Sequence, residues 1–486
     1  MNVLLLTPPS LQLSFGKIKK LSDALPSIGL AYIGAVLRNN GINVKILDAY
    51  AEETKIQDIV QVVTNNQIDL IGISVLTTSA DLVEEIVHTL RKEAPSVIVV
   101  LGNVHASIFA ENILLRDGAD IIVHNEGEYT MLDIVQALEK ESPLNEIDGI
   151  SFKQDGKIIH TKSREFISDL DQLPYPAWDL YDIKKYQTDP RTEVKDTLFR
   201  YQILATRGCP NQCTFCSSRS AKSLGTKYRM RKPKAIVDEI EHLYLNFGAR
   251  TILFMDLAFP LVKEHAMAVC QEIIDRGYHK KITWSSECRV KPIDQEMLEK
   301  MRESGCIRVN FGIESGQDRI LKMIKKGINT TDVRKAVTLA NNAGIEVDGL
   351  FMIGLPTETP EDIKKTIDFA ICLDIRYATF NVFVPFPGSE LFTELSDKKL
   401  LHYNSWSEFN EYPAYTESEP VYTPETLTHK EIIELQKTAL RRFYFRYAFI
   451  SKEIMRIKPL MLVTYIRAVW ALRPHLKTPN LFNKTN

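Results

Sequence analysis

Three cysteines lie close together in the stretch RGCPNQCTFCSS, which covers residues 207–218. Cys209, Cys213 and Cys216 fall within eight residues, although the whole chain of 486 residues contains only seven cysteines. The residues between the first two cysteines, Pro-Asn-Gln, indicate a turn rather than a strand of the core. Three thiols on one turn predict a site for a metal centre.

The number of thiols decides between the metal centres that such a turn could hold. A structural zinc site needs four ligands, and no fourth Cys or His stands beside this turn, so zinc would require a distant ligand such as His279 or Cys288. Thiolates are the usual ligands of a cubane [4Fe-4S] cluster, and three of them would leave one iron open. An open iron can bind and reduce a ligand, and we favour this alternative over zinc.

The elements that must position this turn are alternating strands and helices. Six βα units are expected in residues 201–392, which predicts a partial (βα)6 barrel of the TIM type. In such barrels the chemistry takes place where strands lead into βα loops, and the cysteine turn follows the first strand. The expected strand-to-loop segments are 201–209, 251–259, 282–290, 306–315, 347–356 and 378–388.

The first part of the chain shows the same alternation, so residues 1–140 are expected to form a doubly wound, Rossmann-like α/β domain with a parallel sheet. Such sheets bind ligands beyond the carboxyl ends of their strands. Residues 141–200 are predicted to form a linker that includes a hairpin turning at Asp155–Gly156. Residues 393–486 are predicted to form a mostly helical region. The polar loops expected at one edge of the sheet are 7–10, 76–79, 102–107 and 125–128.

The composition is that of an ordinary globular protein, with 44% hydrophobic and 25% charged residues. The formal net charge of −2 provides no basic field, so no nucleic-acid partner is expected. No secretory signal and no apolar run of membrane-spanning length is evident, and the odd number of cysteines is not that of a disulfide framework. These features predict a cytoplasmic protein.

The cysteine spacing, with Phe215 just before the last cysteine and a partial barrel behind it, resembles the radical S-adenosylmethionine (radical SAM) superfamily. The resemblance implies that the open iron of a [4Fe-4S] cluster chelates the amino and carboxylate groups of S-adenosylmethionine. One electron, from an external donor of the flavodoxin or ferredoxin type, would then cleave the sulfonium and yield a 5′-deoxyadenosyl radical.

The same resemblance implies that groups at the ends of the barrel strands bind S-adenosylmethionine. Asp256 would face the methionine amine, although related enzymes often have paired acids where this chain has Asp-Leu. For Glu287 and Arg289 a role as surface residues remains equally open. The four cysteines outside the turn are expected to be core residues. The expected S-adenosylmethionine contacts are Phe215, Asp256, Glu287, Arg289, Glu314, Ser315, Gly354 and Pro356.

The first 140 residues resemble the cobalamin-binding domain found ahead of many radical SAM enzymes, on the basis of PSIGL, GISVLTTS, GNVHAS and NEGE. The Asp-x-His-x-x-Gly signature that supplies a histidine to cobalt is absent, so cobalamin would be held without a protein histidine. The alternative is a domain that has kept the fold and lost the corrin. The expected cobalamin contacts are Thr7, Pro8, Leu76, Thr77, Thr78, Gly102, Asn103, His105, Glu126 and Gly127.

Together the two resemblances imply an enzyme of the class B radical SAM methyltransferase type, which methylates an unactivated carbon of a small-molecule or lipid-like substrate. Cyclisation or rearrangement, with or without cobalamin, and a non-enzymatic metal-dependent sensor are the alternatives, and no single residue is assigned a catalytic role. Between Lys437 and Lys484 stand eleven Lys or Arg and one acid, Glu453. This tail could lie on a membrane surface, or it could form a helical cap over the barrel, which we favour.

Overall fold

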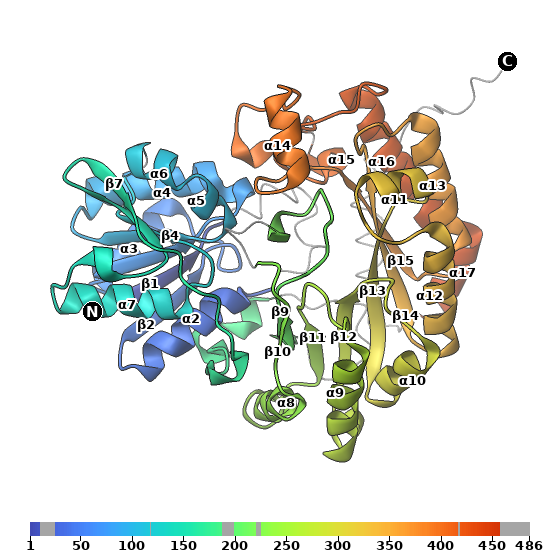
Figure 1. The fold of residues 1–486 in the computed structure, drawn as a ribbon, viewed down its shortest axis with the longest axis horizontal. Helices are drawn as coiled ribbons and strands as arrows, with labels where there is room; N and C mark the ends of the chain where they lie inside the picture. The colour runs from blue at the N-terminus through green and yellow to red at the C-terminus, as the bar shows by residue number, and fades with distance from the viewer. Residues whose placement is uncertain (10–24, 117, 187–198, 220–224, 417, 457–486) are drawn as a thin grey trace.

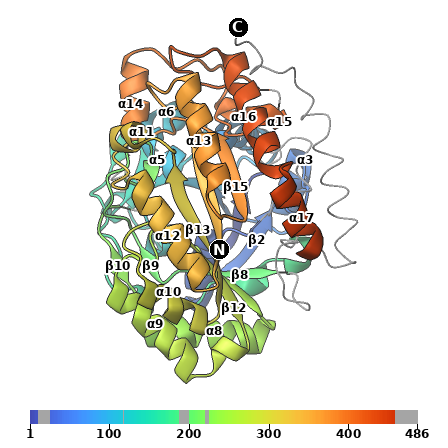
Figure 2. The same cartoon turned by 90° about the vertical axis from the view of Figure 1, so that its right-hand side faces the viewer.

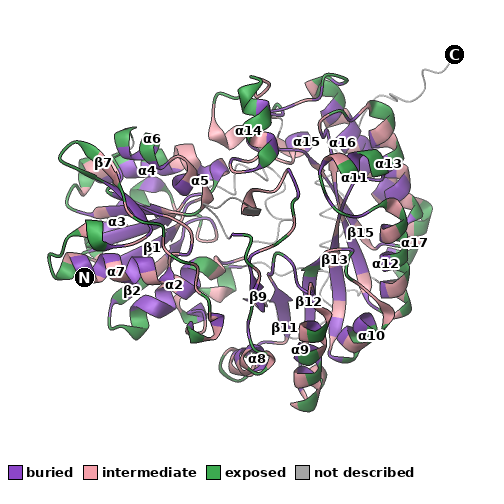
Figure 3. Ribbon diagram, viewed as in Figure 1, coloured by how far each residue is buried: buried purple, intermediate pink, exposed green. Residues whose placement is uncertain are grey.

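A computed structural model of the protein describes residues 1–9, 25–116, 118–186, 199–219, 225–416 and 418–456. Two α/β units stand side by side, and a helical C-terminal region runs along the second unit and reaches back to the first (Figure 1). Buried residues form the strands at the centre of each unit, and exposed residues lie on the outer faces of the helices (Figure 3).

The N-terminal unit is built on a sheet of seven described strands in the order β2-β1-β3-β4-β5-β6-β7. The first five strands are parallel, and β6 and β7 form the antiparallel hairpin predicted at Asp155–Gly156. The predicted boundary at residue 140 falls between the last helix and this hairpin. The strands are β1 Asn2–Thr7, β2 Asn43–Asp48, β3 Leu70–Ser74, β4 Ile98–Gly102, β5 Ile121–Val123, β6 Ile150–Gln154 and β7 Lys157–His160.

Helices cover both faces of this sheet, as predicted for a doubly wound domain. One apolar core lies between the sheet and α2 and α7, and a second lies between the sheet and α3, α4 and α6. The inner strands β1, β3, β4 and β5 are mostly apolar because parallel strands covered on both faces have no solvent-facing side. The helices are α2 Ile28–Asn39, α3 Ile56–Asn65, α4 Ala80–Glu93, α5 Val104–Ile108, α6 Ala110–Arg116 and α7 Glu128–Glu139.

The second unit is the predicted partial barrel. Its six described strands are all parallel and follow the order β15-β14-β13-β12-β11-β8, so β8 and β15 are the two edges of an open barrel. The strands are β8 Arg200–Ile203, β11 Thr251–Phe254, β12 Thr283–Cys288, β13 Cys306–Glu314, β14 Glu346–Ile353 and β15 Tyr377–Val382.

Helices pack on the outer face of the barrel, and α13 and α16 lie side by side over β14 and β15 (Figure 2). Alternation along the strands separates the two faces, since Phe380 and Val382 of β15 are buried and Phe380 contacts Phe443 of α16. Asn381, between them, therefore faces the barrel interior. The covering helices are α8 Pro233–Phe247, α9 Lys263–Asp275, α10 Gln295–Glu303, α12 Thr330–Asn342, α13 Pro360–Cys372 and α16 His429–Tyr444.

The segment between the two units is packed against both of them. The Ala177 N–H donates to Ala31 O of α2 over 3.1 Å. Trp178 is fully buried and contacts Tyr201 of β8, with ring centroids 6.2 Å apart. The Tyr186 hydroxyl donates to Asp48 Oδ2 of β2 over 2.7 Å. These contacts hold the two units in one arrangement.

The C-terminal region also bridges the two units. Its short helix η9 (Trp406–Glu408) contacts the N-terminal unit, where the Trp406 and His105 rings lie 4.8 Å apart. Asp81 at the start of α4 accepts hydrogen bonds from the Ser405 hydroxyl (2.5 Å) and the Ser407 N–H (3.2 Å). The other helices of this region are α14 Glu390–Asp397, α15 Pro413–Thr416 and α17 Tyr447–Arg456.

Two further expectations can be compared with the structure. Cys270, Cys288 and Cys306 are buried, as predicted. Cys372 is exposed because it is the last residue of α13, so its prediction as a core residue was wrong.

Among the described residues no helix is long and apolar enough to cross a membrane. The part of the basic tail beyond residue 456 lies outside the described residues.

Candidate functional site

The cysteine turn directly follows a two-residue strand, β9 (Thr206–Arg207). This strand pairs antiparallel with β10 (Arg229–Met230). Gly208 follows with φ +85°, and a Cβ at this position would lie 2.2 Å from Lys227 O. Only glycine tolerates both the left-handed backbone and this close approach. The Cys209 N–H then donates to Gly225 O over 3.3 Å, so the chain turns sharply just before its first thiol.

The middle of the turn is held by two other parts of the barrel. The Thr214 N–H donates to Ile324 O after α11 (Asp318–Met323), and Thr214 O accepts from Leu391 N–H at the start of α14, both over 3.0 Å. These bonds join segments that are far apart in the sequence. The turn between Cys213 and Cys216 is therefore fixed by the tertiary structure rather than by its own residues alone.

Each of the three thiols has a polar side chain beside it. Asn211 Nδ2 donates to Cys209 Sγ (3.2 Å), and the Ser218 hydroxyl lies 2.8 Å from Cys216 Sγ. Arg289 Nη1 donates to Cys213 Sγ over 3.6 Å. In the described part of the chain, no three His, Cys, Asp or Glu side chains are arranged to hold a single metal ion. The donor set of three thiols next to hydrogen-bond donors fits a thiolate-bound iron–sulfur cluster.

Asp256, predicted to face S-adenosylmethionine, lies directly after β11 and is only 2% exposed. Its Oδ1 accepts from the N–H and the hydroxyl of Thr206, both at 2.5 Å, and its Oδ2 accepts from Ala205 N–H at 3.2 Å. Burial raises the pKa of Asp256 to about 7, although these hydrogen bonds act in the opposite direction. Both oxygens are engaged in holding the segment that leads into the cysteine turn.

Glu287 and Arg289, at the end of β12, differ in their surroundings. Glu287 is exposed although β12 is an inner strand with helices over its outer face, so its side chain points into the open barrel. The protein that surrounds the barrel interior limits the hydration of this carboxylate and raises the pKa of Glu287, as does the nearby Glu314, while Arg200 acts in the opposite direction. Arg289 is turned to the cysteine turn and also donates to Lys326 O. The two residues thus flank the mouth of the barrel.

Glu314 and Ser315, at the end of β13, point in different directions. Glu314 has φ +67° and its Oε1 accepts from Lys326 Nζ at 2.5 Å, and the same ammonium lies 5.6 Å from the centre of the Phe215 ring. This group adjoins the cysteine turn. The Ser315 hydroxyl is fully buried and hydrogen-bonds Thr366 Oγ1 of α13 over 3.2 Å, so it faces the outer helix layer instead.

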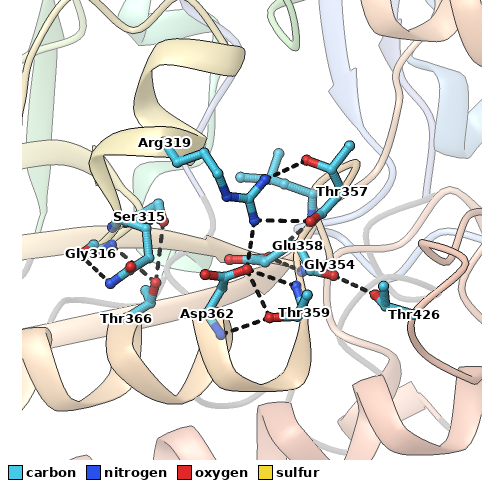
Figure 4. Close-up of polar contacts among 12 residues, drawn as sticks. Ser315, Gly316, Arg319, Gly354, Thr357, Glu358, Thr359, Asp362, Thr366 and Thr426 are labelled. Atoms are coloured by element: carbon cyan, nitrogen blue, oxygen red, sulfur yellow. Dashed lines mark hydrogen bonds and ion pairs between the residues drawn. The ribbon is translucent and has the colours of Figure 1, made fainter.

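The loop after β14 contains Gly354, Pro356 and a carboxylate that the sequence analysis missed, Glu358. Its Oε2 accepts from Gly354 N–H (2.7 Å) and Leu355 N–H (3.1 Å), and Thr426 of the C-terminal region donates to its backbone carbonyl (2.5 Å), as Figure 4 shows. Burial raises the pKa of Glu358 to about 8. The sequence signal that could have identified Glu358 is its position, four residues after the glycine at the end of the strand.

Gly354 itself has φ +82°, and a Cβ there would lie 2.9 Å from Ile432 Cδ1 of α16. On the outer side of the loop, Arg319 donates to Thr357 and to Asp362, the residue that caps α13 together with Thr359 (Figure 4). The loop is therefore fixed on both sides, which presents the half-buried Pro356 in a defined position.

A cavity of about 300 Å³ lies at the carboxyl edge of the N-terminal sheet. Four of the predicted cobalamin contacts line it, namely Gly102, Asn103, Glu126 and Gly127. Its walls are mostly apolar and reach the barrel at Thr206, Arg207 and Gly208. Further lining residues that the sequence analysis did not list are Leu5, Ser27, Gly29, Tyr32, Gly72 and Met131.

Small residues keep this cavity open. A Cβ at Gly72 would lie 3.1 Å from Leu5 Cδ2 and 3.3 Å from Met131 Cε, and a Cβ at Gly127 would lie 3.2 Å from Ile33 Cδ1. An apolar slot with a few polar groups at its rim, such as Asn103, suits a bulky cofactor that carries amide groups. These residues fit cobalamin.

The remaining predicted contacts do not line the cavity. Thr7 ends β1 and its buried hydroxyl has no partner among the described residues, and Pro8 follows it. Leu76 is exposed and Thr78 half-buried at the 3-10 turn η2 (Thr77–Ser79). Thr77 is buried, with its Oγ1 3.4 Å from His105 Nδ1.

His105 is enclosed by aromatic rings. It is 3% exposed, and its ring centroid lies 4.7 Å from that of Phe109 and 4.8 Å from that of Trp406. Burial lowers the pKa of His105 to about 4, so the imidazole is neutral at neutral pH. This histidine packs the C-terminal region against the N-terminal unit.

Substituting Gly208 by alanine is expected to prevent cluster assembly, because the new Cβ would collide with Lys227 O and displace the first cysteine. Iron and sulfide bound after anaerobic reconstitution should fall to background. The matched control is Gly156→Ala in the hairpin, which has φ +77° and no atom within 4 Å of a Cβ. It carries the same left-handed strain, about 1–2 kcal/mol, and should bind iron normally. Equal iron content in both variants would contradict this account of the turn.

His105 should make the protein less stable in acid. Its pKa is about 4 when folded and about 6.5 when unfolded, so the unfolded chain binds the proton more tightly. The stability that neutral His105 provides is present above pH 6.5 and is lost as the pH falls towards 4, by up to about 3 kcal/mol.

Urea unfolding at about pH 7.5 and about pH 4.5 checks this sign. The loss of unfolding free energy on acidification should shrink in His105→Gln and stay unchanged in the control His88→Gln, whose ring is exposed. The same loss in both variants would show that His105 does not carry the effect.

Comparisons with known proteins agree with the two units. Residues 203–370 match the family model described as the radical SAM superfamily, and residues 18–135 match the B12 binding domain. The chain is 32% identical over 457 residues to an uncharacterized methyltransferase of Pyrococcus horikoshii, covering 93% of this chain and 95% of that protein. It is 29% identical to the cytidylyl-2-hydroxyethylphosphonate methyltransferase of Streptomyces wedmorensis, covering 76% and 77%.

Other relatives catalyse a different reaction. The anaerobic magnesium-protoporphyrin IX monomethyl ester cyclase of Cereibacter sphaeroides is 26% identical, with 88% of this chain and 68% of that protein covered. Among solved structures, the fold resembles the radical SAM methyltransferase TsrM from Kitasatospora setae with cobalamin and a [4Fe-4S] cluster bound (TM-score 0.69, 18% identity, 95% and 92% covered).

The fold also resembles OxsB, a cobalamin-dependent radical enzyme, with aqua-cobalamin and S-adenosylmethionine bound (TM-score 0.72, 19% identity, 98% and 71% covered). The two units match the two domain models, and the methyltransferase of Pyrococcus horikoshii is 32% identical over 93% of this chain, which together show the family. It belongs to the radical SAM superfamily as an enzyme with an N-terminal B12-binding domain, and its cofactors are a [4Fe-4S] cluster, S-adenosylmethionine and cobalamin.

Proposed function

We propose that this enzyme transfers a methyl group to an unactivated carbon of a small molecule. The main support for the proposal is that residues of the barrel unit form one wall of the cavity in the B12-binding domain. The cavity of the B12-binding domain is lined by Thr206, Arg207 and Gly208, the residues that lead directly into Cys209. A methyl donor on one side of this wall and a radical generated on the other side could meet the same substrate. Two of the relatives described above are methyltransferases.

In this proposal Cys209, Cys213 and Cys216 hold the cluster, whose free iron binds S-adenosylmethionine. The cofactors supply the radical chemistry and the methyl group, and the chain orients the reactants and excludes water. Glu314, Lys326 and Glu287 are suited to bind the charged methionine end, because Lys326 pairs with Glu314 beside Phe215 of the turn and Glu287 lies near Glu314. The fixed loop at Gly354 and Pro356 would lie against the adenine.

Asp256, Arg289 and Ser315 take supporting roles in this assignment. The Asp256 carboxylate accepts three hydrogen bonds from the segment ahead of the turn, and the Arg289 guanidinium lies against Cys213. Ser315 is bonded to α13. Phe215 is suited to shield the cluster edge, since its ring packs beside Lys326.

The inner face of the barrel favours a polar substrate over a lipid-like one. Asn381 of β15 faces inward, and its Nδ2 donates to Glu411 Oε2 over 3.0 Å. Burial and the nearby Glu314 raise the pKa of Glu411 to about 7. Together with Glu287, these groups give the interior several hydrogen-bond acceptors, which would be costly to cover with an apolar chain.

The test is anaerobic reconstitution with iron, sulfide and hydroxocobalamin, a strong one-electron reductant, and S-adenosylmethionine with a deuterated methyl group, in an extract of small metabolites. We expect 5′-deoxyadenosine and one labelled metabolite. Cys213→Ala should lose both products, whereas Cys372→Ala, which changes an exposed thiol, should keep both.

Other outcomes separate the alternatives. A protein that retains no corrin absorbance would exclude the cobalamin-dependent reaction, and zinc without sulfide would exclude the radical reaction. A product that has changed without gaining label would indicate cyclisation or rearrangement instead. Reduced flavodoxin or ferredoxin should replace the chemical reductant, since we propose such a protein as the electron donor.

The first part of the basic tail, in α16, packs on β15 as the favoured helical cap, and we propose membrane association only for the end of the chain that follows it. Phe445, Tyr447, Ile450 and Met455 are exposed on and before α17, just ahead of the basic and apolar residues 457–486. Truncation after residue 456 should reduce co-sedimentation with anionic liposomes. The cut must not fall at Lys437, because α16 belongs to the barrel core. Equal sedimentation of the full-length and truncated chains would refute this proposal.

A further inference from the structure

Four charged side chains are buried where the two units meet. Glu126 lies in the loop just before α7 in the B12-binding domain and Glu128 is the first residue of α7, whereas Arg207 and Arg229 belong to β9 and β10 of the second unit. Their exposed fractions are 8%, 4%, 9% and 5% respectively. We call this set the interface bridge.

The contacts of the interface bridge are short and specific. Arg207 uses both branches of its guanidinium, with Nη1 3.1 Å from Glu126 Oε1 and Nη2 2.7 Å from Glu128 Oε1. Arg229 Nη1 lies 2.9 Å from each oxygen of Glu126. The guanidinium carbon of Arg207 is 5.0 Å from the centre of the Tyr32 ring of α2. Because the planar guanidinium of Arg207 is bonded through both of its terminal nitrogens, these contacts fix its orientation as well as its distance from the two glutamates.

The linker takes part in the same network. The Ile167 N–H donates to Glu126 Oε2 over 2.7 Å, and Ile167 O accepts from Arg229 Nη1 over 2.7 Å. Phe166 packs its ring against the Arg229 guanidinium at 5.1 Å. The two units and the linker are therefore joined at one point.

The bridge stands next to both cofactor sites. Arg207 is followed directly by Gly208 and Cys209, and it pairs with Arg229 across β9 and β10. Glu126, Glu128 and Arg207 also line the cavity of the B12-binding domain. A shift of Arg207 would therefore change the position of the first thiol relative to that cavity.

The ion pairs of the bridge favour the charged forms of Glu126 and Arg207. Arg229 and Arg207 hold the pKa of Glu126 below its usual range despite its burial, and the two glutamates raise the pKa of Arg207. Buried ion pairs of this kind commonly add less stability than apolar residues of the same shape would. A specific geometry is a better explanation for their presence than stability.

We propose that Arg207 is a positioning residue, which through Glu126 and Glu128 fixes the cluster turn at a set distance and orientation from the corrin. The inference rests on the proposed function for its catalytic consequence, because methyl transfer requires both centres at one substrate. Cleavage of S-adenosylmethionine requires the cluster alone. Loosening the bridge should therefore separate the two activities.

The test compares Arg207→Lys and Glu128→Gln with Arg231→Lys. A lysine keeps the charge at residue 207 but cannot bond both glutamates, and Glu128→Gln leaves Glu126 to balance Arg207. Arg231 is a matched control, since it is equally buried in ion pairs with Asp171 and Glu239, neither of which belongs to the B12-binding domain.

The first readout is pulsed electron paramagnetic resonance of the holoenzyme, with cob(II)alamin and the reduced cluster as the two spins. We expect one narrow distance in the wild type and in Arg231→Lys, and a broadened or shifted distance in Arg207→Lys and Glu128→Gln. An unchanged distance in the two bridge variants, or the same change in the control, would overturn the proposal. This measurement needs no substrate, so it holds even if the wild type transfers no methyl group.

The second readout is the ratio of 5′-deoxyadenosine to methylated product. Misplacement by about 1 Å can cost about 100-fold in rate, so methyl transfer should fall by that order in Arg207→Lys while cleavage of S-adenosylmethionine continues. A parallel loss of both activities would indicate a merely structural role. If Arg207→Lys fails to fold, Glu128→Gln decides the outcome by the same two readouts.

Discussion

The fold of this enzyme depends on the way its two sheets meet, at the carboxyl ends of their parallel strands. Parallel strands place all of their following loops on one edge, so each unit has a single edge at which cofactors can bind. In this protein the two edges share a cavity wall at Thr206–Gly208. The contact is held by buried ion pairs on one side and by the aromatic contact between His105 and Trp406 on the other.

The cysteine turn shows how strongly a short segment can depend on distant ones. Its start is fixed by Gly208 against the backbone of Lys227 and by Asp256, and its middle is bonded to residues after α11 and at the start of α14. The bonds from the N–H groups of Ala205, Thr206, Thr214 and Leu391 satisfy backbone donors that would otherwise be buried without a partner. These contacts fix the backbone that carries the three thiols.

The sequence was sufficient to predict the main features of the fold and the cysteine turn, because both depend on local patterns. Alternating strands and helices have a recognisable period, and the spacing of Cys209, Cys213 and Cys216 is contained in one turn. Gly102 and Gly127 were also predicted at the correct edge of the sheet, since strand ends are local features as well.

Residues whose roles depend on distant partners could not be assigned in this way. The sequence places Asp256 at the end of a barrel strand, but it does not reveal that both carboxylate oxygens bond the chain ahead of the turn. Glu126 was predicted as a cobalamin contact, and its carboxylate pairs with two arginines about a hundred residues away in the sequence. The ring of His105 contacts the ring of Trp406, which comes about three hundred residues later in the sequence. No pattern within a short window contains such pairings.

The central claim is that the cluster and cobalamin occupy two sites on either side of one wall. Anomalous X-ray scattering from crystals of the holoenzyme, recorded at the iron and cobalt edges, tests it most directly. The account predicts iron beside Cys209, Cys213 and Cys216 and cobalt next to the cavity lined by Gly102 and Gly127. Iron bound elsewhere, or cobalt away from that cavity, would contradict it.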